Sequence, residues 1–373
     1  MSILFFLSLT LLIYTFVGYP AILKLVKSEK TSPPIKDEKL PELTVLLCIY
    51  NSANQLASRI ENILASDYPS AKLNILVVSD GSTDNPERII DKLNTPQITL
   101  LQYPENKGKS YALSYAFQHV STEYIAFTDV RQSFKSDALK LLAHNLSSEK
   151  IGAVSGNLVI TSKANNEETG LYWKYEKSIR QKESDLNSLL GVTGAIYMAK
   201  TKLLPNLPHD SLLDDMYIPL SMVQQGYKIK FCEQAIAYDK ASGTIEEEFT
   251  RKVRTLAGNY QLIKQMPWLL SPKKNPLFFQ FLSHKIARLI MPFALISLFV
   301  SSFYLDSPTQ PIFITTQIVF YVYTLLGYLT KNSNTQLPLI NTCISFCSLN
   351  LAALLACWKY LTVKDITSLW KKH

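Results

Sequence analysis

This 373-residue sequence lacks both glycine-rich patterns that usually cradle a phosphate group. Neither GxxxxGK[ST] nor GxGxxG occurs in it, so we expect neither a P-loop nor a dinucleotide-binding turn. Cysteine is scarce: there are five, none in a CxxC pair, and three share one apolar segment, namely Cys343, Cys347 and Cys357. A zinc site and a disulfide framework are therefore not expected, and a reduced cytoplasmic setting fits. Internal repeats and low-complexity tracts are also absent.

No nucleic-acid-binding module accompanies the net charge of +8, so an excess of cations facing anionic lipid is the simpler explanation. Charge is almost missing from Met1 to Val26, where Lys24 is the single charged residue. Because roughly 20 apolar residues cross a bilayer as a helix, residues 1–27 are predicted to form an N-terminal transmembrane helix. The segment has no basic start and no small-x-small cleavage pattern, which disfavours a cleaved signal peptide.

Three further apolar blocks crowd the C-terminal third, at Leu289–Leu305, Ile312–Thr330 and Leu337–Leu361. We predict about three transmembrane helices followed by a basic tail within residues 289–373. Buried core helices are the alternative interpretation. Together with the first segment, these blocks predict an integral protein of the plasma (inner) membrane.

Lysine and arginine in the loops predict the orientation in the membrane. Lysines follow the first span, at Lys24, Lys27 and Lys30, which places the N-terminus outside and the polar middle in the cytoplasm. Three later spans would then leave the basic tail outside, against the same rule. Either one segment is re-entrant or interfacial, or the tail breaks the rule, and the sequence leaves both alternatives open.

The polar middle, residues 42–265, is predicted to be one α/β domain behind a proline-containing linker at 28–41. Apolar strands are predicted at 43–50, 73–80, 98–104, 123–130, 151–160, 191–199 and 229–239. Amphipathic helices are predicted at 54–64, 85–93, 109–120, 171–183, 212–227 and 244–265. This alternation indicates a mostly parallel sheet with helices on both faces. Residues 266–288 contain FFQFLSHKIAR, whose mixed composition predicts a segment lying in the membrane interface.

The most informative motif is VVSDGSTD, at the end of the strand predicted at 73–80. It places Asp80 and Asp84 where the chain leaves a buried strand, and open α/β sheets bind nucleotides at such ends. An acidic loop there suits hydrogen bonds from a nucleobase or ribose. The alternative is that an Asp caps a turn or helix. We favour nucleotide contact for Asp80 and capping for Asp84.

Further motifs follow in a fixed order: NKGKSYAL, TDVR, a DD pair followed ten residues later by GY, and RxxRT. Together with CIYN and SDGSTD, they resemble family-2 glycosyltransferases over roughly residues 41–265. The SHKIAR segment resembles the membrane branch that includes hyaluronan, cellulose and poly-N-acetylglucosamine synthases. The resemblance implies a GT-A-like α/β fold flanked by transmembrane helices, an inverting reaction and a nucleotide-sugar donor.

On the donor side, the resemblance implies that Asp80 reads the base or ribose, that Tyr50 and Asn51 cup the base, and that Lys109 reaches the nucleotide. Asp129 matches the first acid of the family's DxD pair, which implies Mg²⁺ or Mn²⁺ with Asp129 as a ligand.

Two departures from the family pattern concern arginines. Arg131 replaces the second DxD acid, which puts the geometry of the metal in doubt; the guanidinium can pair with phosphate, or form a surface salt bridge. Arg251 and Arg254 match the QxxRW box, read here as RKVRT. They would neutralise the leaving diphosphate, or merely lie at the membrane surface. The missing Trp weakens a polymerase interpretation.

For catalysis, the resemblance assigns Asp215 as the base that takes the acceptor hydroxyl's proton. Asp214 stands beside it in place of the usual Glu, and helix capping is the alternative for the pair. Thr193 and Gly194 are expected to approach the acceptor because Gly permits close backbone contact. His284 is expected to be structural.

The sequence thus predicts a membrane-bound inverting glycosyltransferase (hexosyltransferase class) acting on a nucleoside-diphosphate sugar, UDP-linked, with a saccharide or lipid-linked acceptor. The product would belong to a cell-surface polysaccharide or exopolysaccharide. The alternatives are a processive synthase that also exports its product, and a non-catalytic nucleotide-sugar-binding membrane protein. A transporter is disfavoured because the C-terminal spans carry essentially no charge.

Overall fold

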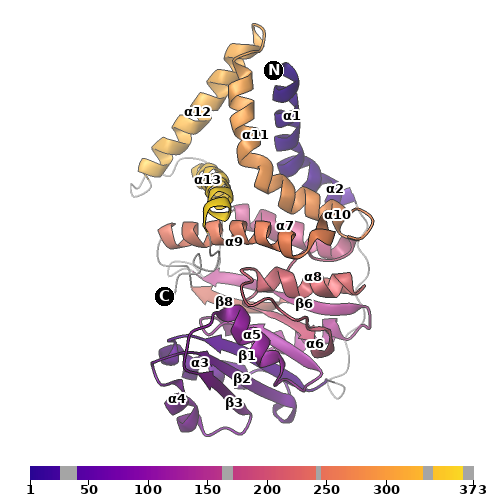
Figure 1. Ribbon diagram of the computed structural model, residues 1–373, viewed down its shortest axis with the longest axis vertical. Helices are drawn as coiled ribbons and strands as arrows, with labels where there is room; N and C mark the ends of the chain where they lie inside the picture. The colour runs from indigo at the N-terminus through magenta and orange to yellow at the C-terminus, as the bar shows by residue number, and fades with distance from the viewer. Residues whose placement is uncertain (26–39, 162–170, 241–244, 331–338, 364–373) are drawn as a thin grey trace. The chain divides into compact units, whose positions relative to one another are not determined.

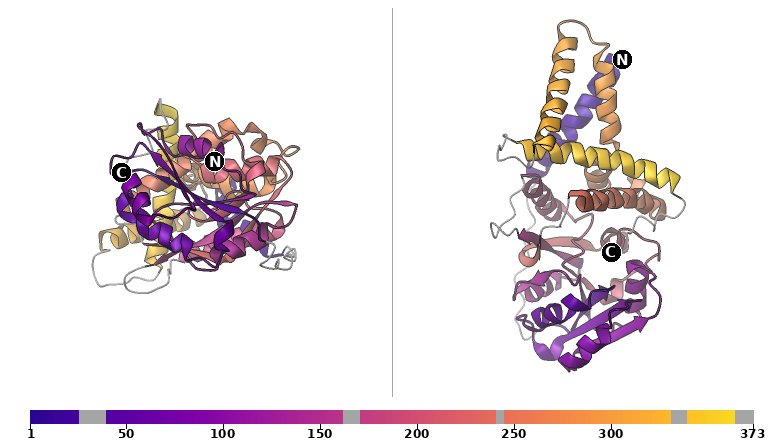
Figure 2. Two further views of the ribbon diagram at one scale, coloured as in Figure 1. Left: turned by 90° about the horizontal axis from the view of Figure 1, so that it is seen from below. Right: turned by 90° about the vertical axis from the view of Figure 1, so that its left-hand side faces the viewer.

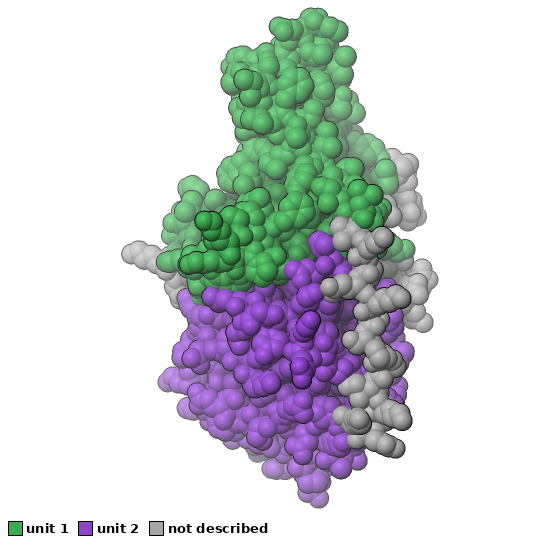
Figure 3. Space-filling model, turned by 90° about the vertical axis from the view of Figure 1, so that its right-hand side faces the viewer, with its two compact units in different colours: residues 1–27, 169–182, 242–373 green, residues 28–168, 183–241 purple. Residues whose placement is uncertain are grey.

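The computed structural model describes residues 1–25, 40–161, 171–240, 245–330 and 339–363. The chain divides into two compact units (Figure 3). Unit 1 comprises Met1–Lys27, Thr169–Lys182 and Ser242–His373, and unit 2 comprises Ser28–Glu168 and Glu183–Ala241. Most of the linker expected at 28–41, and the basic tail from residue 364, lie outside the described residues. The domain boundaries drawn from the sequence stay a prediction.

Unit 2 is built on one eight-stranded sheet with the order β3-β2-β1-β4-β7-β6-β8-β5 (Figure 1). Strands β1 to β4 pair in parallel, and so do β6 and β8. Strand β7 is antiparallel to β4 and β6, and β5 is antiparallel to β8. The predicted mostly parallel α/β sheet is confirmed. The strands are β1 Leu43–Ile49, β2 Leu73–Asp80, β3 Ile98–Tyr103, β4 Tyr124–Thr128, β5 Ser133–Phe134, β6 Ile151–Thr161, β7 Tyr197–Lys200 and β8 Lys228–Lys240.

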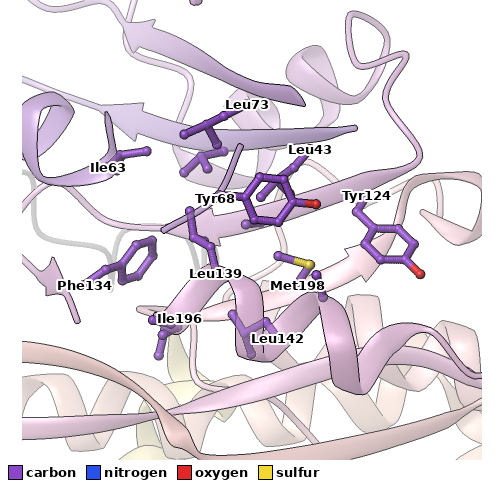
Figure 4. Packing of buried hydrophobic residues seen from close by; sticks show 14 of the residues in the cluster. Leu43, Ile63, Tyr68, Leu73, Tyr124, Phe134, Leu139, Leu142, Ile196 and Met198 are labelled. Atoms are coloured by element: carbon purple, nitrogen blue, oxygen red, sulfur yellow. The ribbon is translucent and has the colours of Figure 1, made fainter. Parts of the chain in front are cut away.

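Burial on both sides of the central strands explains why they are continuously apolar. Alternate residues of β1, such as Val45 and Leu47, join one hydrophobic cluster with helices α3 (Ala53–Leu64) and α6 (Ala138–Leu146), as Figure 4 shows in close-up. Leu46, between them, is equally buried but lies outside that cluster. Helices α5 (Lys109–Phe117) and α8 (Asp214–Gln224) pack on the sheet with buried residues that are also outside it. Helices therefore cover both faces, as predicted.

The register brings several loop residues to one edge of the sheet. Ile49 of β1 pairs with Ser79 of β2, and Leu47 of β1 pairs with Thr128 of β4. Since these strands are parallel, the residues that follow them leave the sheet at the same edge. The loops that follow Ile49, Asp80 and Thr128 are therefore close to one another.

One predicted strand was too long. The apolar stretch 191–199 was expected to be a strand throughout, but β7 begins only at Tyr197. The residues before it form an irregular loop, in which Val192 N–H donates to the Asp215 carbonyl and Thr193 N–H donates to Ser155 Oγ. These long-range bonds take backbone groups that a strand would have used in a ladder. The α6 helix and the short β5 strand were not predicted; α4 (Pro86–Leu93) was.

Among its described residues, unit 1 contains four helical stretches that are long and apolar enough to cross a membrane: Ser2–Leu25, Phe278–Ser302, Thr309–Leu329 and Ile340–Thr362. The first comprises α1 (Ser2–Ile13), a π-helical turn and α2 (Tyr19–Leu25). The second comprises α10 (Phe278–Gln280), a π-helical turn and α11 (Ala287–Ser302), so the segment expected in the interface begins this stretch. The others are α12 (Thr309–Leu329) and α13 (Ile340–Thr362). The amphipathic helices α7 (Leu171–Leu186) and α9 (Ile245–Gln265) accompany them.

A buried ionic cluster ties α7 to the second membrane stretch within unit 1. Arg288 Nη1 lies 2.7 Å from Glu176 Oε1 in an ion pair, and His284 Nε2 lies 3.3 Å from the other carboxylate oxygen. Burial alone would raise the pKa of Glu176, but the Arg288 and His284 side chains lower it to about 2. His284 is buried in this cluster.

Candidate active site

Asp80 ends β2 with a carboxylate that protein donors surround. Its Oδ1 accepts from Tyr103 Oη at 3.0 Å and from Lys107 N–H at 2.7 Å. Its Oδ2 accepts from Asn106 Nδ2 at 3.0 Å and from Gly108 N–H at 2.9 Å. A carboxylate has about four lone-pair sites, and these four donors match that number. Any nucleoside contact of Asp80 would have to share these oxygens, and its predicted role in reading the base or ribose stays a prediction.

The bonds to Asp80 fold the loop at residues 105–108 back onto the end of β2. Gly81 makes this approach possible, because its φ is +66° and a Cβ there would lie 2.4 Å from Asn106 N. Helix α5 starts directly after the loop, with Lys109 as its first residue. Asp80 therefore determines where the ammonium group of Lys109 lies, although the two side chains do not touch.

Lys109 joins two of the acids that the sequence analysis singled out. Its Nζ is 3.0 Å from Asp129 Oδ1 and 3.7 Å from Asp214 Oδ2. Burial acts to lower the pKa of Lys109, but the carboxylates of Asp129 and Asp214 outweigh it and raise that pKa above its ordinary value. The ammonium therefore stays charged at every physiological pH. Asp214 is buried, whereas 42% of the Asp129 side chain is exposed, so Asp129 remains open to a ligand.

Asp215 lies in the first turn of α8, where a carboxylate interacts favourably with the helix dipole. Pro219, four residues later, has no N–H to donate to the Asp215 carbonyl. That carbonyl accepts instead from Val192 N–H at 2.9 Å, which draws the loop before β7 beside the acid.

Gly194 lies close to both Asp215 and Lys109. A Cβ built on Gly194 would lie 4.0 Å from Asp215 Oδ2 and 4.0 Å from Lys109 Nζ. The structure thus brings Lys109, Asp129, Asp214, Asp215 and Gly194 into one site, as the sequence analysis expected of convergent motifs. Thr193, next to Gly194, is partly exposed in the same loop.

Arg131, at the second position of the former DxD pair, has a protein partner. Its Nη2 donates to Asp239 Oδ2 at 2.6 Å, and Gln132 Nε2 donates to the same oxygen at 3.0 Å. Asp239 is 5% exposed near the end of β8, whereas nearly half of the Arg131 side chain is exposed. The salt-bridge alternative for Arg131 therefore has a specific buried partner, which sequence analysis missed.

Arg59, which was also not predicted from the sequence, is buried next to the loop that contains Asp129. It is 2% exposed, donates from Nη2 to Thr128 Oγ1 at 2.7 Å and sits 4.0 Å from the centre of the Phe134 ring. Burial lowers its pKa to about 9, although the charge of Asp129 opposes that shift. A charged residue at the core-facing position of an amphipathic helix was the signal in the sequence: Leu56, Arg59 and Ile60 share one face of α3.

Residues at the end of β1 mainly bind the neighbouring loop. Asn51 Oδ1 accepts from Thr83 N–H at 2.9 Å, and Asn51 N–H donates to Ser82 Oγ at 3.2 Å. Asp84 Oδ2 accepts from Ala53 N–H at 2.7 Å, at the start of α3. The helix that follows Asp84, α4, has no side-chain cap, so Asp84 binds the start of a different helix from the one expected. Tyr50 is partly exposed beside them. The base-cupping role of Tyr50 and Asn51 stays a prediction.

Arg251 and Arg254 lie on α9, in unit 1, whereas the acids lie in unit 2. Their assignment to the leaving diphosphate is therefore still a prediction.

The protein offers few ligands for a divalent ion at this site. The DxD motif offers it one carboxylate, Asp129, and one oxygen of that group already contacts Lys109. Among the residues that the structure describes, no group of three His, Cys, Asp or Glu side chains is placed to hold a metal ion. An ion here fits only as a bridge, with phosphate oxygens of a donor supplying ligands that the chain does not.

Comparisons with known proteins bear on the family and the fold of the chain. The family model for glycosyl transferase family 2 matches residues 44–204. Poly-beta-1,6-N-acetyl-D-glucosamine synthase of Staphylococcus aureus is 24% identical over 255 residues, which are 66% of this chain and 61% of the relative. The enzyme of the same name from Staphylococcus epidermidis is 24% identical over 263 residues, 68% of this chain and 62% of the relative. The chain thus spans about three fifths of the length of these curated relatives.

A solved structure with a similar fold is a mannosyltransferase from Pyrobaculum calidifontis in complex with GDP-Man and Mn²⁺. The TM-score is 0.75 at 20% identity, and the match covers 97% of this chain and 100% of the other. The GT-A-like fold expected from the motifs is thereby confirmed.

Proposed function

We propose that this chain, which carries a glycosyltransferase family 2 domain, transfers a sugar with inversion from a nucleoside-diphosphate donor, UDP-linked, to a saccharide or lipid-linked acceptor. The product would belong to a cell-surface polysaccharide or exopolysaccharide. One observation carries the proposal: Lys109 lies within 4.0 Å of both Asp129 and Asp214, and Gly194 adjoins Lys109 and Asp215. A cation for a diphosphate and a carboxylate for a hydroxyl thus both lie beside Gly194.

In this reaction Asp215 acts as the general base. Its carboxylate accepts the proton of the acceptor hydroxyl as that oxygen bonds to the anomeric carbon, and the bond from that carbon to the diphosphate oxygen breaks. The nucleoside diphosphate leaves with the electron pair. Gly194 supports this role because its lack of a side chain leaves room beside Asp215 Oδ2 for an acceptor sugar. Asp214 stays with Lys109 and keeps that ammonium in place.

The leaving diphosphate gains negative charge, which fixed cations stabilise. Lys109 supplies one, and Arg254 and Arg251 are proposed to supply others. Mg²⁺ or Mn²⁺, held by Asp129 and the donor's phosphate oxygens, would neutralise further charge on that diphosphate when bound. Arg59, buried beneath Thr128, adds a positive charge close to Asp129 without reaching solvent.

Four apolar helices support an integral membrane protein, and loop charges favour a plasma (inner) membrane with the catalytic domain in the cytoplasm. Donor nucleotide sugars are then available on the same side as the site.

A panel of nucleotide sugars, assayed with membranes that contain the full chain, tests the proposal. The readout is the nucleoside diphosphate released and the sugar transferred. We expect one donor class to be turned over, and transfer to disappear in Asp215→Asn. If no donor on the panel is consumed, or if Asp215→Asn transfers at the normal rate, the proposed reaction or the assigned base is wrong.

A processive synthase is the second candidate, favoured by the names of the staphylococcal relatives. Product length separates the two: a ladder of long saccharides at low enzyme concentration indicates a synthase, and a single added sugar indicates simple transfer. Thr255, at the Trp position of the QxxRW box, favours the single addition.

A further inference from the structure

The four apolar stretches of unit 1 conflict with the distribution of lysines if all of them cross the bilayer. They qualify as spans by length and composition only. Residues 1–23 are uncharged, and lysines follow from Lys24 onward, which places the connection to unit 2 in the cytoplasm. Four crossings would then put the lysines at 364, 371 and 372 outside. One of the four stretches must therefore behave differently, or the charge rule fails here.

Helix α13 packs against α9, and it does so more extensively than the other apolar stretches. Ala352 and Ala356 of α13 form a buried cluster with Val253 and Ala257 of α9. The rings of Tyr260 and Tyr360 stack with their centres 5.4 Å apart. The small side chains let the two backbones approach closely, so α13 lies directly on α9.

Helix α9 cannot lie in the hydrocarbon layer, because seven of its 21 residues are charged: Glu246, Glu247, Glu248, Arg251, Lys252, Arg254 and Lys264. Charged side chains at the bilayer centre are strongly disfavoured. A helix packed on α9 therefore lies at the depth of the headgroups, not across the membrane.

Within unit 1, α13 also lies crosswise to α11 and α12. Figure 1 shows α13 foreshortened while α11 and α12 extend upward, and the right-hand view of Figure 2 shows α13 running across them. Helix α1 packs alongside α11. If α1, α11 and α12 cross the membrane, α13 lies parallel to its surface.

The face of α13 opposite α9 is apolar and open. Leu351, Trp358 and Leu361 are 52%, 66% and 74% exposed and share that face. Trp is enriched at the membrane–water boundary, and Lys359 beside it can reach the headgroups. This chemistry fits the boundary between headgroups and acyl chains.

We propose that α13 lies in the plane of the membrane interface, with Leu351, Trp358 and Leu361 in lipid, and that the chain crosses the bilayer three times. The loop between α11 and α12, residues 303–308, has no Lys or Arg and lies outside, whereas Lys331 and the lysines beyond α13 lie in the cytoplasm. The loop charges then agree with the orientation throughout. The proposal concerns the membrane surface and does not depend on which sugar the site transfers.

Depth measurements on spin-labelled full-length protein in vesicles test the proposal. Single labels are placed at Ile344, Leu351 and Leu361, which share the face of α13 opposite α9 and are partly or fully exposed, in a background without the five cysteines. An in-plane helix puts all three at one shallow depth. A spanning helix separates Ile344 from Leu361 by about 25 Å along its axis.

The exposed residues Ile312, Val319 and Leu329 of α12 provide the matched control, because labels there should differ steadily in depth. If the α13 labels show the same gradient as the α12 labels, the proposal is wrong.

Reporter fusions to the C-terminus of the unmodified chain give an independent readout. A fluorescent protein that matures only in the cytoplasm should be bright, and alkaline phosphatase, which is active only outside, should be silent. The reverse pattern would place the C-terminus outside and would overturn the three-span arrangement.

Discussion

Two acids at strand ends of unit 2, Asp80 at the end of β2 and Asp129 just after β4, have opposite environments. Asp80 is 4% exposed and accepts four hydrogen bonds, three from the loop at residues 105–108 and one from Tyr103 of β3. Asp129 has a side chain that is 42% exposed and contacts Lys109. We call a carboxylate closed when protein donors surround it, as at Asp80, and open when solvent reaches it, as at Asp129 and the partly exposed Asp215. The difference lies in the number of hydrogen-bond donors that other segments of the chain bring to each carboxylate.

Asp80 and Asp129 indicate that similar acidic motifs can act at different distances from a substrate. A closed carboxylate acts through the fold, because it positions the loop before α5 and hence Lys109. An open carboxylate acts on what binds. Substitutions of open and closed acids test the division between them.

The largest effect is expected at an open acid. Asp215→Asn removes the proton acceptor and should lower the transfer rate by roughly 10²–10⁴-fold. Donor affinity and melting temperature should change little, because Asn keeps the size and polarity of the group. Steady-state kinetics and nucleotide binding on the same preparation check this. Asp91→Asn on the exposed face of α4 is the matched control. A variant that loses stability in step with activity would show that Asp215 acts through the fold.

A smaller loss is expected when the metal is removed. Chelation with EDTA should reduce donor binding and transfer by roughly 10–100-fold, and Mn²⁺ should restore both. Asp129→Asn should cause a similar loss and should make the remaining activity insensitive to EDTA. Isothermal titration with the nucleoside diphosphate, with and without Mn²⁺, measures the effect apart from turnover. Equal EDTA sensitivity in both proteins would show that Asp129 is not the ligand.

Substitution of the closed acid Asp80 is expected to lower the stability of the fold. Asp80→Asn places an NH₂ group among donors and leaves buried N–H groups unpaired, which costs about 1–3 kcal/mol in the free energy of unfolding. Urea unfolding measures it, with Asp129→Asn as the open counterpart that should unfold like the wild type. Were the two variants equally stable, the division into open and closed acids would have no energetic basis.

The smallest effect concerns a second closed acid, Glu176 in unit 1, whose donors are cations. Arg288 and His284 outweigh burial and lower the pKa of Glu176 from 4.5 to about 2. A depressed folded-state pKa contributes stability that is fully present above about pH 4.5 and is lost as the pH falls through about 2. Melting temperatures of wild type and Glu176→Gln should therefore converge across that window. Parallel curves would contradict the ion pair.

Much of the fold followed from local patterns. Apolar runs such as 43–50 and 73–80 predicted β1 and β2 because a buried parallel strand must be apolar on both faces. The prediction of a strand throughout 191–199 was wrong because backbone N–H groups of this stretch donate to Ser155 and Asp215, which no local pattern reveals. At the site, the order of the motifs singled out Asp129, Asp214 and Asp215, whereas the position of Lys109 between Asp129 and Asp214 came from the structure. The partner of Arg131 was missed because Asp239 lies far along the chain, whereas the burial of Arg59 was missed although its position on the core-facing side of α3 indicated it.

The amino-acid sequence by itself determined which strands are buried, which stretches suit a membrane and which acids end up at one edge of the sheet, because periodicity and chain order encode burial locally. Only the tertiary structure decided which acid is open, that Arg131 pairs with Asp239, and that α13 rests on α9. Each of these depends on how many donors or apolar neighbours arrive from distant parts of the chain, and long-range packing alone supplies that number.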